Sequence, residues 1–358
     1  MNRKHFAFLL LLSVLSIINY AQLSITGKVK DVQTKEPLIN ASVFCENTTS
    51  GTITDPEGHF SLSLSPGGYN LIISYTGYKT QKLKITENAE NLQILLKREE
   101  VRLREVVVSA KSKLVEDGWS NYGIFFINNF IGTTPNAANC YLLNPEVLKF
   151  YYYENDNKIK VFAKAALKVR NLALGYILSY QLDSFVYHFD DAIFSYQGTC
   201  LYTEMQGTDK EKRTWIRNRK TAYEGSVLHF MRSYYNGTLR NEGWDIGLQE
   251  EDDATTFDKV ANPLDTIYYK RESDKEQIEI YYPRRIKITY LKKIPEPEYL
   301  EKYGLAKNIT RQSSAVDMKS SIIIKENGYY YDPMSWISYN YWSWKNVADQ
   351  LPDDYAPD

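Results

Sequence analysis

The stretch GTITDPEGHFSLSLSPGGYNLIISYTGYKT, residues 51–80, decides the fold of the first part of the chain. In HFSLSL, apolar and polar residues alternate, so Phe60, Leu62 and Leu64 share one face. LIISY follows a Pro-Gly-Gly break, and a further run begins at Tyr78 after Gly77. Alternation bounded by Gly, Pro and Asp is typical of antiparallel strands joined by tight turns. The pattern predicts a β fold and indicates no particular reaction.

Similar runs extend on both sides of this stretch. About seven short strands at regular spacing predict a seven-stranded β-sandwich over residues 23–97. Residues 98–115 are charged and are predicted to be a linker, with a short edge strand at residues 106–108. Residues 116–358 mix strand and helix patterns and are predicted to form an α+β domain. The expected fold class is therefore mostly β with some α.

An ordered set of residues in the first region carries a family resemblance. The set consists of Gly27, Pro37, Ala41, Gly51, Thr54-Asp55, Gly58, Phe60, Gly68-Tyr69 and Gly77-Tyr78. With these residues the region resembles the carboxypeptidase-regulatory-like domain of exported Bacteroidetes proteins. The resemblance implies a transthyretin-like sandwich and a Gram-negative envelope location, because such domains often precede TonB-dependent outer-membrane receptors. EVVVSA at residues 105–110 resembles the segment that follows the domain there. We expect a different kind of protein, since too few residues remain for a receptor's plug and barrel.

The first 21 residues have the pattern of a signal peptide. Arg3 and Lys4 precede an apolar run from Phe6 to Ile18, and Ala21 is a plausible cleavage point. That run is too short to span a bilayer, and no later apolar run is long enough. We therefore expect an exported protein, in the periplasm or associated with the outer membrane. The net charge of -1 gives no argument for nucleic-acid binding.

The second region shows several distinct patterns. We expect a helix at residues 122–131, a hairpin from 147–153 and 159–163, and a long hairpin from 175–189 and 192–205. Residues 214–235 predict one amphipathic helix, and residues 239–261 a polar loop. Further strands are expected at 267–269, 278–282, 286–290 and 322–325. LNPEVLKFYYY and RTWIRNRKTAYEGSVLHFMRSYYNGTL resemble the region after the same β-domain in short Bacteroidetes envelope proteins, which implies architecture and compartment but no catalytic residues.

Three cysteines are an odd number for an exported chain. Cys45 lies in a strand pattern and is expected to be a small buried hydrophobe. Cys140 and Cys200 are spaced unlike a metal site, and a disulfide between them stays open.

Catalytic candidates cluster around His229. Ser226 lies three residues before it, so both share a helix face, and Tyr223 lies near. In a hydrolase His229 would act as base and Ser226 as nucleophile, with Glu204 or Asp190 as the acidic partner. The alternative is a histidine packed beneath the sheet and bonded to a Tyr hydroxyl. No His has the spacing of a zinc carboxypeptidase, and we predict no metal and no cofactor.

Two further groups are candidate binding residues. Arg213, Arg217 and Arg219, with Lys220, form a basic cluster that we place at the start of the predicted helix. It would contact an anionic glycan, lipid headgroups or a partner, or else be a solvated face paired with Glu211 and Glu224. Trp342 and Trp344 belong to an aromatic tail that either offers a stacking platform or seals the core.

These patterns favour a non-enzymatic, exported cell-envelope protein that binds or scaffolds an envelope protein or glycan. The alternatives are a hydrolase of envelope polymers centred on His229 and an accessory to TonB-dependent uptake.

Overall fold

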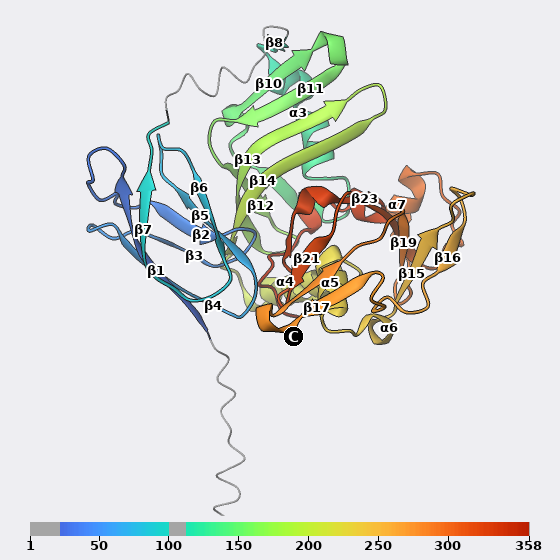
Figure 1. Ribbon diagram of the computed structural model, residues 1–358. Coiled ribbons are helices and arrows are strands. Elements are labelled where there is room, and N and C mark those ends of the chain that lie inside the picture. The colour runs from blue at the N-terminus through green and yellow to red at the C-terminus, as the bar shows by residue number, and fades with distance from the viewer. Residues whose placement is uncertain (1–21, 100–111, 358) are drawn as a thin grey trace, which may run out of the picture.

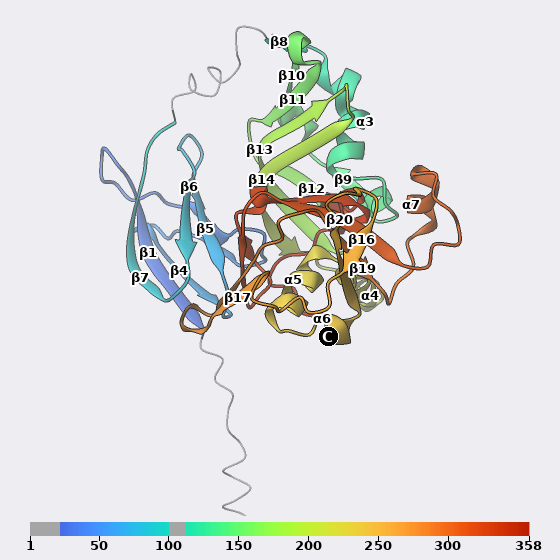
Figure 2. The same ribbon diagram turned by 45° about the vertical axis from the view of Figure 1, so that its right-hand side comes forward.

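The computed structural model describes residues 22–99 and 112–357. The predicted signal segment and the predicted strand at residues 106–108 lie outside them. Three packed parts are visible in Figures 1 and 2: a β-sandwich, a large twisted sheet with one helix on its face, and a C-terminal part with two smaller sheets. The expected fold class, mostly β with some α, is confirmed.

The first part is a sandwich of two small sheets. Their strand orders are β4-β1-β7 and β3-β2-β5-β6. The strands are β1 (Leu23–Asp31), β2 (Ser42–Cys45), β3 (Gly51–Ile53), β4 (His59–Leu64), β5 (Tyr69–Ser74), β6 (Gln81–Ile85) and β7 (Ala89–Leu96). The alternation in β4 buries Phe60, Leu62 and Leu64 and exposes the residues between them. The predicted sandwich is confirmed, although β7 runs parallel to β1.

The second part is a seven-stranded sheet in the order β8-β10-β11-β13-β12-β9, with β14 paired to β13. Its elements are β8 (Ser112–Leu114), α3 (Gly118–Phe130), β9 (Cys140–Leu142), β10 (Leu148–Tyr153), β11 (Lys158–Ala163), β12 (Leu167–Asn171), β13 (Tyr176–His188), β14 (Ile193–Glu204) and α4 (Asp209–Tyr223). Both predicted hairpins are confirmed. The predicted helix at 122–131 is α3, which lies on one face of the sheet (Figure 2) and buries Phe126 and Phe130 against it.

The C-terminal part holds a five-stranded sheet, β16-β15-β19-β20-β23, and a four-stranded sheet, β17-β18-β21-β22. Its helices are α5 (Val227–Tyr235), α6 (Leu239–Glu242), α7 (Pro297–Lys302) and α8 (Tyr341–Trp344). Its strands are β15 (Trp244–Gln249), β16 (Phe257–Lys259), β17 (Tyr269–Glu272), β18 (Gln277–Ile280), β19 (Ile286–Tyr290), β20 (Gln312–Met318), β21 (Ile322–Lys325), β22 (Tyr330–Tyr331) and β23 (Trp336–Asn340). A hydrophobic cluster between α5 and these strands forms its core.

Residues 214–235 form parts of two helices, so the prediction of one helix is wrong. Gly225, between α4 and α5, has φ +85°, a conformation that favours glycine. Ser226 then caps α5 by accepting a hydrogen bond from the His229 amide. The apolar periodicity continues across this break, which explains the error.

The predicted polar loop at residues 239–261 is also wrong. It contains α6, β15 and β16, and β15 is an inner strand of the five-stranded sheet. Trp244, Ile246 and Leu248 alternate with less buried residues along β15 and face the core.

The three cysteines are free thiols. Cys45 is buried, as predicted. Cys140 and Cys200 do not form a disulfide, and burial raises the pKa of Cys140 to about 12.

Candidate functional site

His229 is held in a fixed orientation near the start of α5. Its side chain is only 7% exposed. The Gly225 amide donates a hydrogen bond to Nδ1 at 3.2 Å, so the neutral ring carries its proton on Nε2. Nε2 lies 3.4 Å from a carboxylate oxygen of Glu242, which comes from α6. This histidine therefore links the start of α5 to α6.

Glu204 and Asp190, the acidic partners that a hydrolase would need from the long hairpin, do not contact His229. Glu204 pairs with Arg219 at 2.6 Å, and Asp190 accepts a hydrogen bond from Asn157 at 2.5 Å. Glu242 was missed because residues 239–261 were interpreted as a loop, whereas the α5–α6 turn brings it back to the ring.

Ser226 and Tyr223 surround His229 without completing a catalytic set. The Ser226 hydroxyl caps the helix through the His229 backbone amide, at 3.1 Å. The Tyr223 ring lies 4.9 Å from the imidazole, and Trp244 and Tyr290 pack on its other sides at 5.3 and 5.5 Å. Burial in this aromatic environment lowers the pKa of His229, while Glu242 opposes the shift. The geometry is that of a neutral, packed histidine.

The basic cluster lies in the middle and last turns of α4, so its predicted position at the helix start is wrong. Thr208 and Glu211 form a capping box, and Asp209 and Glu211 place negative charge in the first turn. Negative charge there suits the helix dipole. Hydrogen bonds from Thr208 also lower the pKa of Glu211.

Four cations form one exposed face of α4, which we call the basic face: Lys210, Arg213, Arg217 and Lys220. They are three or four residues apart, so they lie on one side of the helix. Among the residues that the structure describes, no acidic side chain forms a salt bridge with any of them. Glu211, one of the two acids expected to pair with this face, bonds to Thr208 instead.

Arg219 has a different role from Arg213 and Arg217. Its guanidinium donates to the Leu174 carbonyl at 2.7 Å and stacks over the Tyr176 ring at 3.9 Å. With Glu204 also bound to it, its side chain is only 11% exposed. Arg219 therefore fixes α4 against the long hairpin.

Of the two interpretations of Trp342 and Trp344, the stacking platform does not fit the structure, because both side chains are buried. The Trp342 indole donates to the Gly225 carbonyl at 2.8 Å, and Trp344 packs against Tyr299. Both residues seal the C-terminal core, which was the alternative interpretation.

The sandwich is fastened to the second part by its loop at residues 46–50. The Asn47 amide donates to the Cys200 carbonyl at 2.7 Å, and the Tyr202 amide donates to the Thr48 carbonyl at 2.9 Å. The loop thus forms one parallel β-bridge, between Thr48 and Leu201, on the outer edge of β14. The tail then locks the loop, because the Asp353 amide donates to the Asn47 carbonyl at 2.7 Å.

A cavity of about 240 Å³ lies where the sandwich loop, α4, the long hairpin and the tail meet. Its lining consists of Thr49, Tyr176, Glu204, Ile216, Arg219, Pro352, Asp354, Tyr355 and Ala356. Asp354 accepts hydrogen bonds from the Thr49 amide and hydroxyl, so the tail forms one wall. No sequence pattern pointed to this cavity, because walls that are joined by hydrogen bonds, such as Thr49 and Asp354, lie 305 residues apart in the chain.

Residues 22–99 and 112–357 contain no group of three or more His, Cys, Asp or Glu side chains placed to hold a metal ion. Within the same ranges, none of the helices has the length and apolar character needed to cross a membrane.

Comparison with known proteins concerns mainly the first part. Residues 25–108 match the family model of the CarboxypepD_reg-like domain. Over 114 residues the chain is 40% identical to the TonB-dependent receptor SusC of Bacteroides thetaiotaomicron, covering 30% of this chain and 11% of the receptor. It is 36% identical over 104 residues to the TonB-dependent receptor P39 of Formosa agariphila, covering 29% of this chain and 10% of the receptor. The chain thus spans about a tenth of the length of these relatives.

Among solved structures, a type II cohesin–X-dockerin complex from Acetivibrio cellulolyticus aligns with 24% identity over 21% of this chain and 56% of that chain, with a TM-score of 0.18. The predicted resemblance to Bacteroidetes proteins that carry the carboxypeptidase-regulatory-like domain is confirmed by the family match and both receptors.

Proposed function

We propose that this chain is an exported, non-enzymatic envelope protein that binds an anionic group of the envelope through the basic face of α4. The group would be the phosphate or carboxylate of a glycan or of a lipid headgroup. The observation that carries the proposal is the set of four exposed cations on one side of α4. The match of residues 25–108 to the CarboxypepD_reg-like domain and the similarity of about 30% of the chain to TonB-dependent receptors support an envelope-related role.

The spacing of the four cations favours a ligand with repeated negative charges. Lys210 and Lys220 are ten residues apart, or about 15 Å along a helix. Successive cations are therefore closer than the screening length of about 8 Å at physiological salt, and their potentials reinforce one another. Arg213 and Arg217 at the centre can also donate paired hydrogen bonds to phosphate or carboxylate oxygens.

The adjacent cavity adds a place for one small polar unit. Its volume is a little below the roughly 300–1,000 Å³ of ordinary ligand pockets. Ile216 and Arg219 of α4 line it, together with the hydroxyl of Thr49 and the carboxylate of Glu204. A sugar unit of an anionic glycan would therefore find hydrogen-bond partners beside the basic face.

The test measures binding of the mature protein to two probes, an anionic polysaccharide and vesicles that contain anionic lipid. We expect Arg213→Glu/Arg217→Glu to lower affinity at least tenfold for the true ligand, and wild-type binding to weaken as salt rises. The matched control reverses two exposed lysines of the sandwich, Lys79→Glu/Lys97→Glu, and should leave affinity unchanged. Equal losses in both variants, or no binding of either probe, would refute the proposal.

The hydrolase alternative is tested at His229. In our proposal His229→Gln alters only packing, so ligand binding persists in the folded variant. Turnover of an envelope polymer that this substitution abolishes, with stability retained, would overturn the non-enzymatic role.

A second candidate function rests on the receptor similarity. If the sandwich shares a partner with TonB-dependent receptors, the segment of SusC that is similar to this chain, produced alone, should compete with this chain for that partner in envelope extracts. Absence of competition would remove this candidate without affecting the proposal for the basic face.

A further inference from the structure

The cavity of about 240 Å³ and the basic face of α4 meet at one residue, Ile216. Ile216 lines the cavity and is nevertheless 47% exposed. Arg213 lies three residues before it and Lys220 four residues after it, so both are its neighbours on the helix surface. One ligand can therefore reach from the cavity to the basic face.

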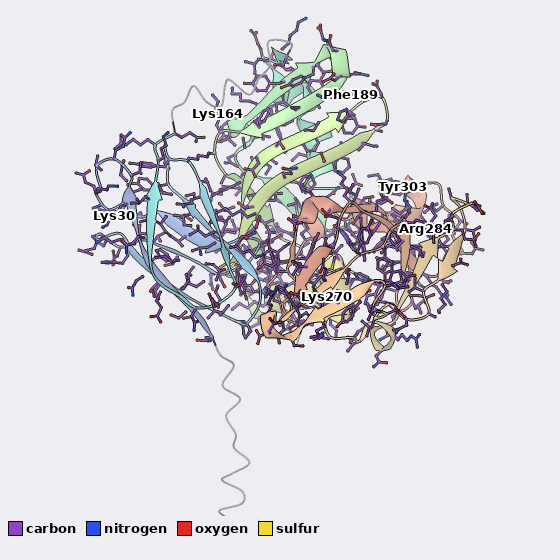
Figure 3. The ribbon with its side chains drawn as sticks, viewed as in Figure 1. Lys30, Lys164, Phe189, Lys270, Arg284 and Tyr303 are labelled. Carbon is purple, nitrogen blue, oxygen red and sulfur yellow. The ribbon has the colours of Figure 1, made fainter. Side chains whose placement is uncertain are left out.

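The tail forms a fixed wall of this cavity. Asp354 Oδ2 accepts hydrogen bonds from the hydroxyl of Thr49 at 2.7 Å and from the hydroxyl of Ser50 at 3.2 Å. These bonds tie the tail to the sandwich at the junction between the parts, which side chains fill in Figure 3. The cavity is thus formed before a ligand enters it.

The polar groups of the cavity are mainly hydrogen-bond acceptors. The Glu204 side chain is 61% exposed, and its Oε1 accepts the 2.6 Å bond from Arg219. No residue that the structure describes donates a hydrogen bond to Oε2 of Glu204. All three guanidinium nitrogens of Arg219 already donate, because Nε and Nη2 bond to the Leu174 and Gly175 carbonyls. The cavity therefore suits a ligand group that donates hydrogen bonds.

The charges in and around the cavity favour an uncharged group. Glu204 and Asp354 outnumber Arg219, so an anionic group is repelled from the cavity. The basic face beside the cavity repels a cationic group. A sugar ring is uncharged and donates through its hydroxyls, and its apolar face can lie against Ile216. Because ordinary ligand pockets have roughly 300–1,000 Å³, this smaller cavity suits a single unit.

We propose that the cavity binds one uncharged sugar unit of an anionic glycan, and that the charged unit next to it contacts Arg213 and Lys220. This inference rests on the proposed binding at the basic face, and it selects a glycan over a phospholipid headgroup as the ligand. The glycan then carries uncharged units beside charged ones. A chain with a carboxylate on every unit would place one beside Glu204 and Asp354, and it binds less tightly despite its higher charge.

The first test compares two polysaccharides of equal chain length, by calorimetry on the mature protein at one salt concentration. In hyaluronate, uronate units alternate with uncharged N-acetylhexosamine units, whereas every unit of polygalacturonate carries a carboxylate. Charge attraction alone predicts tighter binding of polygalacturonate. We expect hyaluronate to bind roughly tenfold more tightly, the gain from one or two hydrogen bonds in the cavity. Equal or tighter binding of polygalacturonate, or of vesicles containing anionic phospholipid, overturns the inference.

The second test closes the cavity with Ile216→Arg. The added charge alone predicts tighter binding of both polysaccharides. In our proposal the long side chain occupies the cavity and pairs with its carboxylates, so the preference for hyaluronate is lost. The matched control, Ile267→Arg, changes an isoleucine that is 69% exposed and should retain the preference. Circular dichroism checks that each variant is folded.

The outcomes separate this inference from the function on which it rests. If Arg213→Glu/Arg217→Glu loses hyaluronate binding while Ile216→Arg binds hyaluronate at least as tightly as the wild type, the cavity site is refuted and the basic face stands. If Arg213→Glu/Arg217→Glu retains full hyaluronate binding, the proposed function is refuted together with this inference.

Discussion

Arg232 on α5 holds the C-terminal tail in place, and its removal gives a quantitative test of the junction. Its guanidinium donates to the Tyr355 carbonyl at 2.6 Å and to the Asp353 carbonyl at 3.0 Å. A third bond goes to the Asn327 carbonyl at 2.8 Å. Arg232→Gln removes the two charge-assisted bonds to the tail while keeping a polar side chain.

The expected magnitude follows from those two bonds. A hydrogen bond from a charged donor contributes about 1.5–3 kcal/mol, and Arg232 is half-buried, so the lower value applies. Two bonds then stabilise the docked tail by about 3 kcal/mol, which is roughly a hundredfold in the equilibrium between docked and released tail.

Hydrogen exchange measures this equilibrium at two amides. The Asp353 amide bonds to the Asn47 carbonyl, and the Thr49 amide bonds to the Asp354 carboxylate, so both depend on the docked tail. We expect both to exchange roughly a hundredfold faster in Arg232→Gln. The control is Arg170→Gln, an exposed arginine on β12. Unchanged exchange, or equally faster exchange in the core of α3, would show that Arg232 does not hold the tail.

Other predictions concern pH, a helix cap and the core. Burial, with a smaller effect of the Glu46 carboxylate, raises the pKa of Asp353 well above its ordinary value, so the folded protein binds this proton more tightly than the unfolded chain. This contribution to the free energy of unfolding is present below the pKa of about 4 of an unfolded Asp, and it is lost as the pH rises through the pKa of Asp353 in the folded protein. In urea unfolding at several pH values, we expect the stability of Asp353→Asn to depend less on pH than that of the wild type. Thr208→Ala should cost about 1 kcal/mol through loss of the α4 cap, whereas Thr208→Ser should retain most of it, as measured by the unfolding midpoint. Phe126→Ala leaves a cavity beneath α3 and should cost about 3–5 kcal/mol, with a smaller loss for Phe126→Leu.

Elements with strong local periodicity were predictable from the sequence. The sandwich strands and the hairpin of β13 and β14 follow from alternation and turn residues, because one face of each strand is buried. The break at Gly225 was also readable, since a glycine before a capping serine marks a helix end followed by a new start. The apolar periodicity alone does not reveal this break, because a 3.6-residue pattern does not show whether the helix backbone is continuous.

The junction was not predictable, for a different physical reason. Its contacts join Asn47, Cys200 and Asp353, which no local pattern connects. Backbone groups make most of these bonds, and every residue has such groups, so residue types carry little signal. Within the candidate site, Arg213 and Arg217 are exposed, which agrees with the helical periodicity of the sequence. The distinct role of Arg219 depends on carbonyls of the β12–β13 turn, which only the folded chain brings near.

The tail, the sandwich loop and the outer edge of β14 at Cys200 and Tyr202 are joined by hydrogen bonds, which leads to a last prediction. Asp353 and Asp354 help to hold the loop over Cys200 and Tyr202, through their hydrogen bonds with Asn47 and Thr49. Release of the tail by Arg232→Gln therefore weakens the cover and exposes more of the same strand edge. A longer free edge offers more backbone bonds to a second copy, so this variant should self-associate more strongly than the wild type, whereas Arg170→Gln should not. Sedimentation velocity over a range of concentrations measures the difference. Equal association of Arg232→Gln and the wild type would show that release of the tail does not uncover the strand edge.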